Sequence, residues 1–146
     1  MIKTVRHVGI VVKDLDKALK LYQDFFRLKI WKREIEEGSY IDKVVGIENA
    51  KVEWIKLKAS DDFIIELLQY HTPLDNTPAP SIISSNRVGC SHVAFTVENI
   101  DQIYRDLISL GYHCNAAPAL SPTGVAKVMY CHDADGTILE LVEIVE

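Results

Sequence analysis

The sequence predicts an α+β fold built from two β-α-β-β-β modules within a single domain, residues 1–146. Two stretches of the chain repeat each other, one beginning at His7 and the other at His92, an offset of 92 − 7 = 85. A second pair repeats around Glu66 and Glu140, at an offset of 140 − 66 = 74. Such internal repetition is typical of a duplicated supersecondary unit. Each half, at roughly 70 residues, is too small to bury a good core alone, so we expect the halves to share one.

The first module is predicted to begin with a strand and a helix. Residues 6–12 alternate, so that His7 and Gly9 share one face of a strand while the intervening aliphatic residues occupy the other. Asp14 is a plausible N-cap for a helix whose apolar residues keep helical spacing as far as Phe26. Three β-rich segments follow, at residues 29–34, 51–58 and 63–70.

The second module is predicted to repeat this order. Asn99 is the candidate N-cap of its helix, and Gly111 supplies the left-handed residue that ends it. Strands are expected at residues 112–116, 126–132 and 137–144. Short turns at residues 60–62 and 133–136 indicate that the last two strands of each module are antiparallel neighbours.

A polar segment separates the modules. Residues 73–87 hold three of the five prolines and several Ser and Asn residues, so we expect a linker between module 1, about 1–72, and module 2, about 88–146. Because 85 − 74 = 11, the first module carries about eleven more residues between its helix and its last strand than the second. Residues 35–50 are the expected insertion, predicted as a loop over a ligand cavity.

Composition narrows the classes of function. With a net charge of −5 and scattered Lys and Arg residues, attraction to a phosphate backbone is not a driving force, so we expect no nucleic-acid partner. No apolar run is long enough to span a bilayer and a strand pattern begins almost at once, so we expect no membrane partner, no signal peptide and a cytoplasmic location. Cys90, Cys114 and Cys131 form no C-x-x-C pair, which argues against a disulfide framework or a thiolate zinc site, and we expect them to be reduced.

The two repeats together supply His7, Glu66, His92 and Glu140. Both glutamates lie between aliphatic residues, where a lone carboxylate costs several kcal/mol unless it is paired or bound to a metal. For either His/Glu pair alone, satisfied strand histidines and solvent-facing glutamates are the favoured interpretation. All four at repeat-equivalent positions instead predict one divalent metal ion per chain. This donor set suits Zn, Ni, Co, Mn or Fe and does not select among them. The other three histidines have no counterparts and are expected at the surface: His71, His113 and His132.

At these residues the chain resembles the vicinal oxygen chelate superfamily, which includes glyoxalase I, methylmalonyl-CoA epimerase, extradiol dioxygenases and the bleomycin and fosfomycin resistance proteins. The resemblance covers nearly the whole chain. It rests on HVGIVVKDLD beginning at His7, HVAFTV beginning at His92, and DADGTILELVE containing Glu140. The superfamily fold implies that the two modules form an eight-stranded curved sheet around a metal-containing cleft. It further implies a small-molecule substrate and a homodimer.

The resemblance also implies roles for the four residues. His7, Glu66, His92 and Glu140 match the metal quartet of glyoxalase I, whereas the epimerase usually has Gln where this chain has Glu66. In the isomerase members a divalent ion stabilises charge on a substrate oxygen while a carboxylate moves a proton. Glu66 or Glu140 would be that catalytic carboxylate.

Three hypotheses for the function remain. The first is a metal-dependent isomerase or lyase, resembling either glyoxalase or the epimerase, in which Glu48 or Glu53, near the insertion, is a candidate for contact with the substrate. The second is a binding or resistance protein without catalysis. The third is an extradiol-type dioxygenase, against which Glu66 as a fourth ligand counts.

Overall fold

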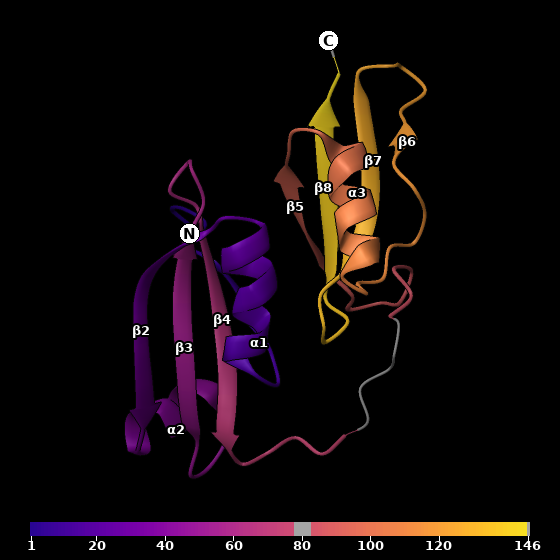
Figure 1. Ribbon diagram of the computed structural model, residues 1–146. Coiled ribbons are helices and arrows are strands. Elements are labelled where there is room, and N and C mark those ends of the chain that lie inside the picture. Colours follow the sequence, from indigo (N-terminus) through magenta and orange to yellow (C-terminus); the bar gives the residue numbers. More distant parts are fainter. Residues whose placement is uncertain (78–82, 146) are drawn as a thin grey trace. The chain divides into compact units, whose positions relative to one another are not determined.

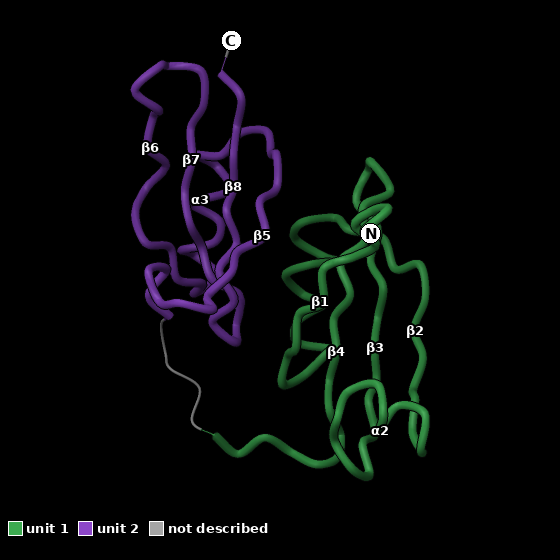
Figure 2. Tube along the Cα trace, turned by 180° about the vertical axis from the view of Figure 1, so that it is seen from behind, with its two compact units in different colours: residues 1–78 green, residues 79–146 purple. Residues whose placement is uncertain are grey.

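The computed structural model describes residues 1–77 and 83–145, and the chain divides into two compact units, residues 1–78 and 79–146 (Figure 2). Each unit contains one four-stranded mixed sheet with helices, which confirms the α+β fold. No helix in these described ranges is both long and apolar enough to cross a membrane.

The described part of the first unit, residues 1–77, contains four strands and three helical segments. They are β1 (Val8–Val11), α1 (Leu15–Leu19), the π-helix η1 (Lys20–Phe25), β2 (Lys29–Glu37), α2 (Ser39–Val45), β3 (Lys51–Lys58) and β4 (Ile64–Thr72). Figure 1 labels β2, β3, β4, α1 and α2 among them. The second unit contains β5 (His92–Thr96), α3 (Ile100–Ser109), β6 (Ala119–Leu120), β7 (Ala126–His132) and β8 (Ile138–Ile144).

Both sheets have the same topology, with strand orders β1-β4-β3-β2 and β5-β8-β7-β6. The first strand of each unit pairs parallel with the last, β1 with β4 and β5 with β8. The last two strands of each unit pair antiparallel, as the turn signals predict. Each unit is therefore one copy of the repeated β-α-β-β-β sequence.

The pleat of β1 follows the predicted alternation. Ile10 and Val12 are buried, whereas Gly9 and Val11 are exposed on the other face. The buried side lies under α1, which Asp14 caps by accepting a hydrogen bond from the backbone N–H of Lys17 at 3.0 Å. That hydrogen bond lowers the pKa of Asp14. Helix α1 thus covers one face of the sheet, and Gly9 and Val11 belong to the opposite face.

The two ends of α3 differ in how far they match the sequence prediction. Asn99 is at the N-cap position, but its backbone is left-handed (φ 59°) and its side chain caps nothing; its N–H donates to Glu143 at 2.6 Å. At the other end Gly111 has φ 85°, and Tyr112 donates to the carbonyl of Leu107 at 2.9 Å, the hydrogen bond of a Schellman motif. The predicted glycine stop is confirmed.

The prediction of a strand at residues 112–116 is wrong. Only a single bridge, between Cys114 and Cys131, forms there, and the edge strand β6 begins later at Ala119. The chain bends at residues 115–117, and Pro118 has no amide hydrogen to donate to a ladder.

The insertion at residues 35–50 is not a loop. It consists of the end of β2, the helix α2 and a short return to β3. Ile41 of α2 packs with Ala50 and Val52, and partly buried apolar residues extend this cluster: Val45, Ile47, Leu68 and Tyr70. The helical spacing of its apolar residues explains why the insertion folds against the sheet rather than standing off it.

Ion pairs connect the helix to the sheet on the helix-covered face of each unit. In the first unit Arg33 contacts Glu53 at 2.6 Å and Asp16 at 3.4 Å, while His71 contacts the other oxygen of Glu53 at 2.8 Å. In the second unit Lys127 contacts Asp101 directly at 2.5 Å. These are repeat-equivalent positions, because 127 − 53 = 74 and 101 − 16 = 85.

We predict that Glu53→Gln destabilises the protein at neutral pH and flattens its acid sensitivity. The hydrogen bonds from His71 and Arg33 lower the pKa of Glu53 from 4.5 in spite of burial, so its stabilisation is present above that value and is lost as the pH falls below it. Because the side chains of Arg33 and His71 are 41% and 35% exposed, solvent screening limits the loss to about 1–2 kcal/mol.

Urea unfolding of wild type and variant at pH 7 and pH 3 measures this difference. The exposed Glu48, changed to Gln, is the control and should follow wild type. An equal gap between Glu53→Gln and wild type at both pH values would contradict the role assigned to this carboxylate.

Candidate functional site

The open face of the first sheet carries a His/Glu pair. Glu66 on β4 lies in register with Gly9 on β1, and His7 precedes Gly9 by two residues, so both side chains emerge on the same face. The Nε2 atom of His7 lies 2.9 Å from Oε2 of Glu66. A Cβ on Gly9 would lie 3.3 Å from the side chain of Leu68, which is tighter than ordinary contact. The position therefore favours glycine.

The second sheet carries the matching pair. Glu140 on β8 lies in register with Ala94 on β5, and His92 again stands two residues earlier. The Nε2 atom of His92 lies 2.9 Å from Oε2 of Glu140. The structure therefore brings together His7 with Glu66, and His92 with Glu140, each pair within its own unit.

The donor spacing suits a divalent ion. Two ligands about 2.1 Å from one ion and at right angles to each other are about 3 Å apart, close to the separation in both pairs. One feature of a metal site is missing at His7. Its Nδ1 atom is buried without a hydrogen-bond partner among the described residues. Metal-bound histidines usually donate this N–H to an outer acceptor. Within each unit, as far as the structure describes it, no third His, Cys, Asp or Glu joins the pair.

Lys56 distinguishes the first pair. It faces Glu66 across the β3–β4 ladder, and its Nζ lies 3.3 Å from Oε1 of Glu66 and 4.3 Å from the ring centroid of Trp54. The Lys56 and Glu66 side chains are only 19% and 11% exposed. The two oxygens of Glu66 therefore have different partners, His7 on one side and a half-buried ammonium on the other.

Tyr130 stands where Lys56 stands in the first unit. It faces Glu140 across the β7–β8 ladder, and its ring centroid lies 5.2 Å from that of His92. Among the described residues, no Lys or Arg is paired with Glu140, whose partner is His92. Sequence analysis missed Lys56 and Tyr130, although the repeat offset identifies them, since 130 − 56 = 74.

The two further carboxylates considered as substrate contacts lie elsewhere. Glu53 is three residues from Lys56 on β3, so it points to the opposite face and contacts Arg33 and His71. Glu48 is exposed in the return from α2 to β3. Neither shares the immediate surroundings of Glu66.

The expectation that the remaining histidines are at the surface is wrong for His132. Its side chain is buried, with Nε2 2.8 Å from the acceptor Oδ1 of Asn115 and Nδ1 3.3 Å from the carbonyl oxygen of Gly136. Burial lowers the pKa of His132, which favours the neutral ring. His71 is tied to Glu53, so both are structural residues with satisfied side chains.

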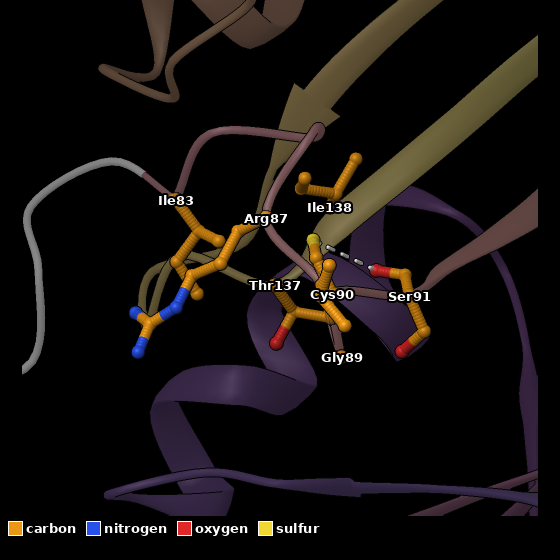
Figure 3. A pocket seen from close by; sticks show the side chains of 8 residues that line it. Ile83, Arg87, Gly89, Cys90, Ser91, Thr137 and Ile138 are labelled. Atoms are coloured by element: carbon orange, nitrogen blue, oxygen red, sulfur yellow. Dashed lines mark hydrogen bonds between the residues drawn. The ribbon is translucent and has the colours of Figure 1, made fainter.

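A hollow of about 370 Å³ lies in the second unit (Figure 3). Its wall combines the segment leading into β5 with the start of β8, and it includes the side chains of Arg87, Cys90, Ser91 and Thr137. Ser91 directly precedes His92 in the chain, but neither His92 nor Glu140 lines the hollow. Its volume is within the range of small-molecule sites. The sequence analysis placed residues 73–87 in a linker and therefore did not consider Arg87 as a possible pocket residue.

Comparison with known proteins gives a consistent family. The model of the glyoxalase/bleomycin resistance protein/dioxygenase superfamily matches residues 6–130. The chain is 31% identical to a lactoylglutathione lyase of Schizosaccharomyces pombe over 147 aligned positions, 94% of this chain and 46% of the relative. The chain thus spans about half the length of that protein.

Solved structures share the fold. A glyoxalase-family protein of Bacillus cereus superposes with a TM-score of 0.86 at 25% identity, covering 100% of this chain and 97% of the other. The fosfomycin resistance protein FosX of Listeria monocytogenes, in a crystal structure with Mn(II) and sulfate, superposes with a TM-score of 0.61 at 16% identity, covering 99% of this chain and 95% of the other.

Proposed function

Because the chain belongs to the glyoxalase/bleomycin resistance protein/dioxygenase superfamily, we propose that it is a divalent-metal-dependent isomerase or lyase that moves a proton on a carbon next to a substrate carbonyl. The observation that carries this proposal is the repeated His/Glu pair, present in both units with the same 2.9 Å separation. The similarity to a lactoylglutathione lyase supports a glyoxalase-like reaction.

The two pairs together would hold the ion, through His7, Glu66, His92 and Glu140. Two neutral imidazoles and two carboxylates balance the charge of a divalent cation. That a structure of FosX, which shares the fold, contains Mn(II) supports a divalent ion as the cofactor class. A bound ion would supply Lewis-acid stabilisation of the negative charge that develops on the substrate oxygen.

The surroundings of the two glutamates support a division of roles. Lys56 and His7 restrain Glu66 from two sides, so Glu66 is suited to hold its position. Glu140 has His92 beside it and the uncharged Tyr130 opposite it. We assign proton transfer to Glu140, because a carboxylate with fewer restraints reorients toward a substrate C–H more readily.

The same surroundings favour a substrate with its own negative charge. Lys56 keeps an ammonium group beside Glu66, at the edge of the proposed site. Arg87 is a second cation, among the residues that line the hollow of the second unit (Figure 3). Neither cation is repeated in the other unit, since Tyr130 replaces Lys56, so the two ends of a bound substrate would meet different environments.

We predict one divalent ion per chain in protein purified without chelator. His92→Ala, Glu66→Gln and Glu140→Gln should each weaken the ion's binding more than about tenfold, because each removes a donor atom or its charge. Elemental analysis and competitive titration with a chromogenic chelator measure both quantities. Glu48→Gln is the matched control, since this carboxylate is exposed in the return from α2 to β3. If wild type holds no metal, or if the control weakens binding equally, a binding protein without metal chemistry becomes the better assignment.

The reaction should exchange a substrate proton with solvent and consume no oxygen. Incubation of 2-oxo thiohemiacetals and 2-methylacyl-CoA esters in deuterated water, followed by mass spectrometry, tests for deuterium at the carbon beside the carbonyl. A parallel oxygen electrode trace with a catechol serves as the counter-assay. Oxygen uptake without deuterium incorporation would overturn the isomerase or lyase assignment in favour of a dioxygenase.

The two glutamates should differ when each is changed to Gln and assayed at saturating metal. Glu140→Gln is expected to lower kcat by about 10²–10⁴, the usual contribution of a general base, with KM little changed. Glu66→Gln should act mainly through metal affinity and recover much of its kcat when metal is added. A larger kcat loss for Glu66→Gln than for Glu140→Gln would reverse the assigned roles.

A further inference from the structure

Two of the three cysteines face each other across neighbouring segments of the second unit. Cys114, in the segment after α3, forms an isolated antiparallel bridge with Cys131 on β7. The flanking hydrogen bonds define the kind of pair. Asn115 donates to the carbonyl of Tyr130 at 2.9 Å, and His132 donates to the carbonyl of His113 at 2.9 Å. The two cysteines exchange no backbone hydrogen bond with each other, so this is a non-hydrogen-bonded pair.

This geometry suits a covalent link. Residues in a non-hydrogen-bonded antiparallel pair have Cα atoms about 4.5 Å apart and side chains on the same face. A disulfide accepts Cα separations of about 4.4–6.8 Å. We propose that Cys114 and Cys131 are a site of disulfide formation, through which oxidation locks the segment after α3 onto β7 in an otherwise reduced protein.

The burial of the two thiols determines which of them reacts first with an oxidant. Cys131 is 1% exposed, whereas Cys114 is only partly buried. Burial raises the pKa of Cys114, and burial together with the neighbouring Cys114 raises the pKa of Cys131 to about 12. Cys114 is therefore the thiol that an external reagent meets first, and the reaction is slow at neutral pH because little thiolate is present.

The oxidant is a low-molecular-weight disulfide. The Cys114 thiolate attacks one of its sulfurs, the small S–S bond breaks, and one small thiolate leaves with the bonding electron pair. Cys131 loses its proton and attacks the Cys114 sulfur, which expels the second small thiolate. The protein loses two electrons and two protons, and the small disulfide is reduced to two thiols.

The link would form on the helix-covered side of the second sheet. Cys131 is adjacent to Tyr130 along β7, so their side chains point to opposite faces. Closing a loop of 131 − 114 = 17 residues restricts the unfolded chain, so the oxidised form should melt at a higher temperature. The His92/Glu140 face would keep its arrangement.

Trypsin separates the three cysteines for the test. Cleavage after Arg87, Arg105 and Lys127 gives peptides 88–105, 106–127 and 128–146, each with one cysteine. Folded protein is incubated with bis(2-hydroxyethyl) disulfide at pH 7, 8 and 9, alkylated, and digested without reductant. Mass spectrometry should find peptides 106–127 and 128–146 joined with the loss of two hydrogen atoms. The rate of joining should rise throughout this pH range, and Tm should increase in step with it.

Matched variants identify the pair. Cys114→Ala should abolish the joined peptides and the Tm increase, whereas Cys90→Ala should retain both, because Cys90 lies at the hollow with its Sγ directed to the carbonyl of Ser91. Recovery of Cys114 and Cys131 as separately alkylated peptides from folded, oxidant-treated wild type would overturn the proposal. So would joining of Cys90 to either of them, or joining that appears only in denaturant.

Discussion

The parallel pairing between the first and last strands of each unit is the constraint on which the candidate site depends. It places a histidine and a glutamate that are far apart in sequence on one face, within 2.9 Å of each other. A shift of one residue in this register would turn Glu66 toward the helix, among the buried aliphatic residues that now fill that face. The residues in register with the two glutamates are small, Gly9 and Ala94, and a Cβ on Gly9 would crowd Leu68.

The two units share one sheet topology and one His/Glu pair each, and they differ in the side chains around the pair. Repeat-equivalent positions hold Lys56 in one unit and Tyr130 in the other, and Glu53 in one and Lys127 in the other. In each case the backbone register is unchanged and the charge is different. The divergence at these positions makes the two units chemically distinct, while each keeps its His/Glu pair.

Sequence alone predicted the features set by local or periodic signals. The alternation around Ile10, the cap at Asp14 and the stop at Gly111 each depend on residues close in the chain, and the structure confirms them. The His/Glu pairs followed from the repeat. The failures involve distant contacts: Asn99 is held by Glu143, and α2 folds because the sheet offers Val52 and Tyr70 to its apolar side. Lys56 was overlooked because an isolated lysine in a strand gives no local signal of its neighbour.

Glu53 and Glu66 lie on adjacent strands and point to opposite faces of one sheet. Among the described residues, the contacts of Glu53 with Arg33 and His71 and those of Glu66 with His7 and Lys56 therefore form separate networks. Under the proposed function, substitutions around Glu66 would alter the metal or substrate contacts and leave the contacts of Glu53 in place. Selection for a new substrate would then act on one surface of the sheet, while the stability that Glu53 contributes is kept on the other.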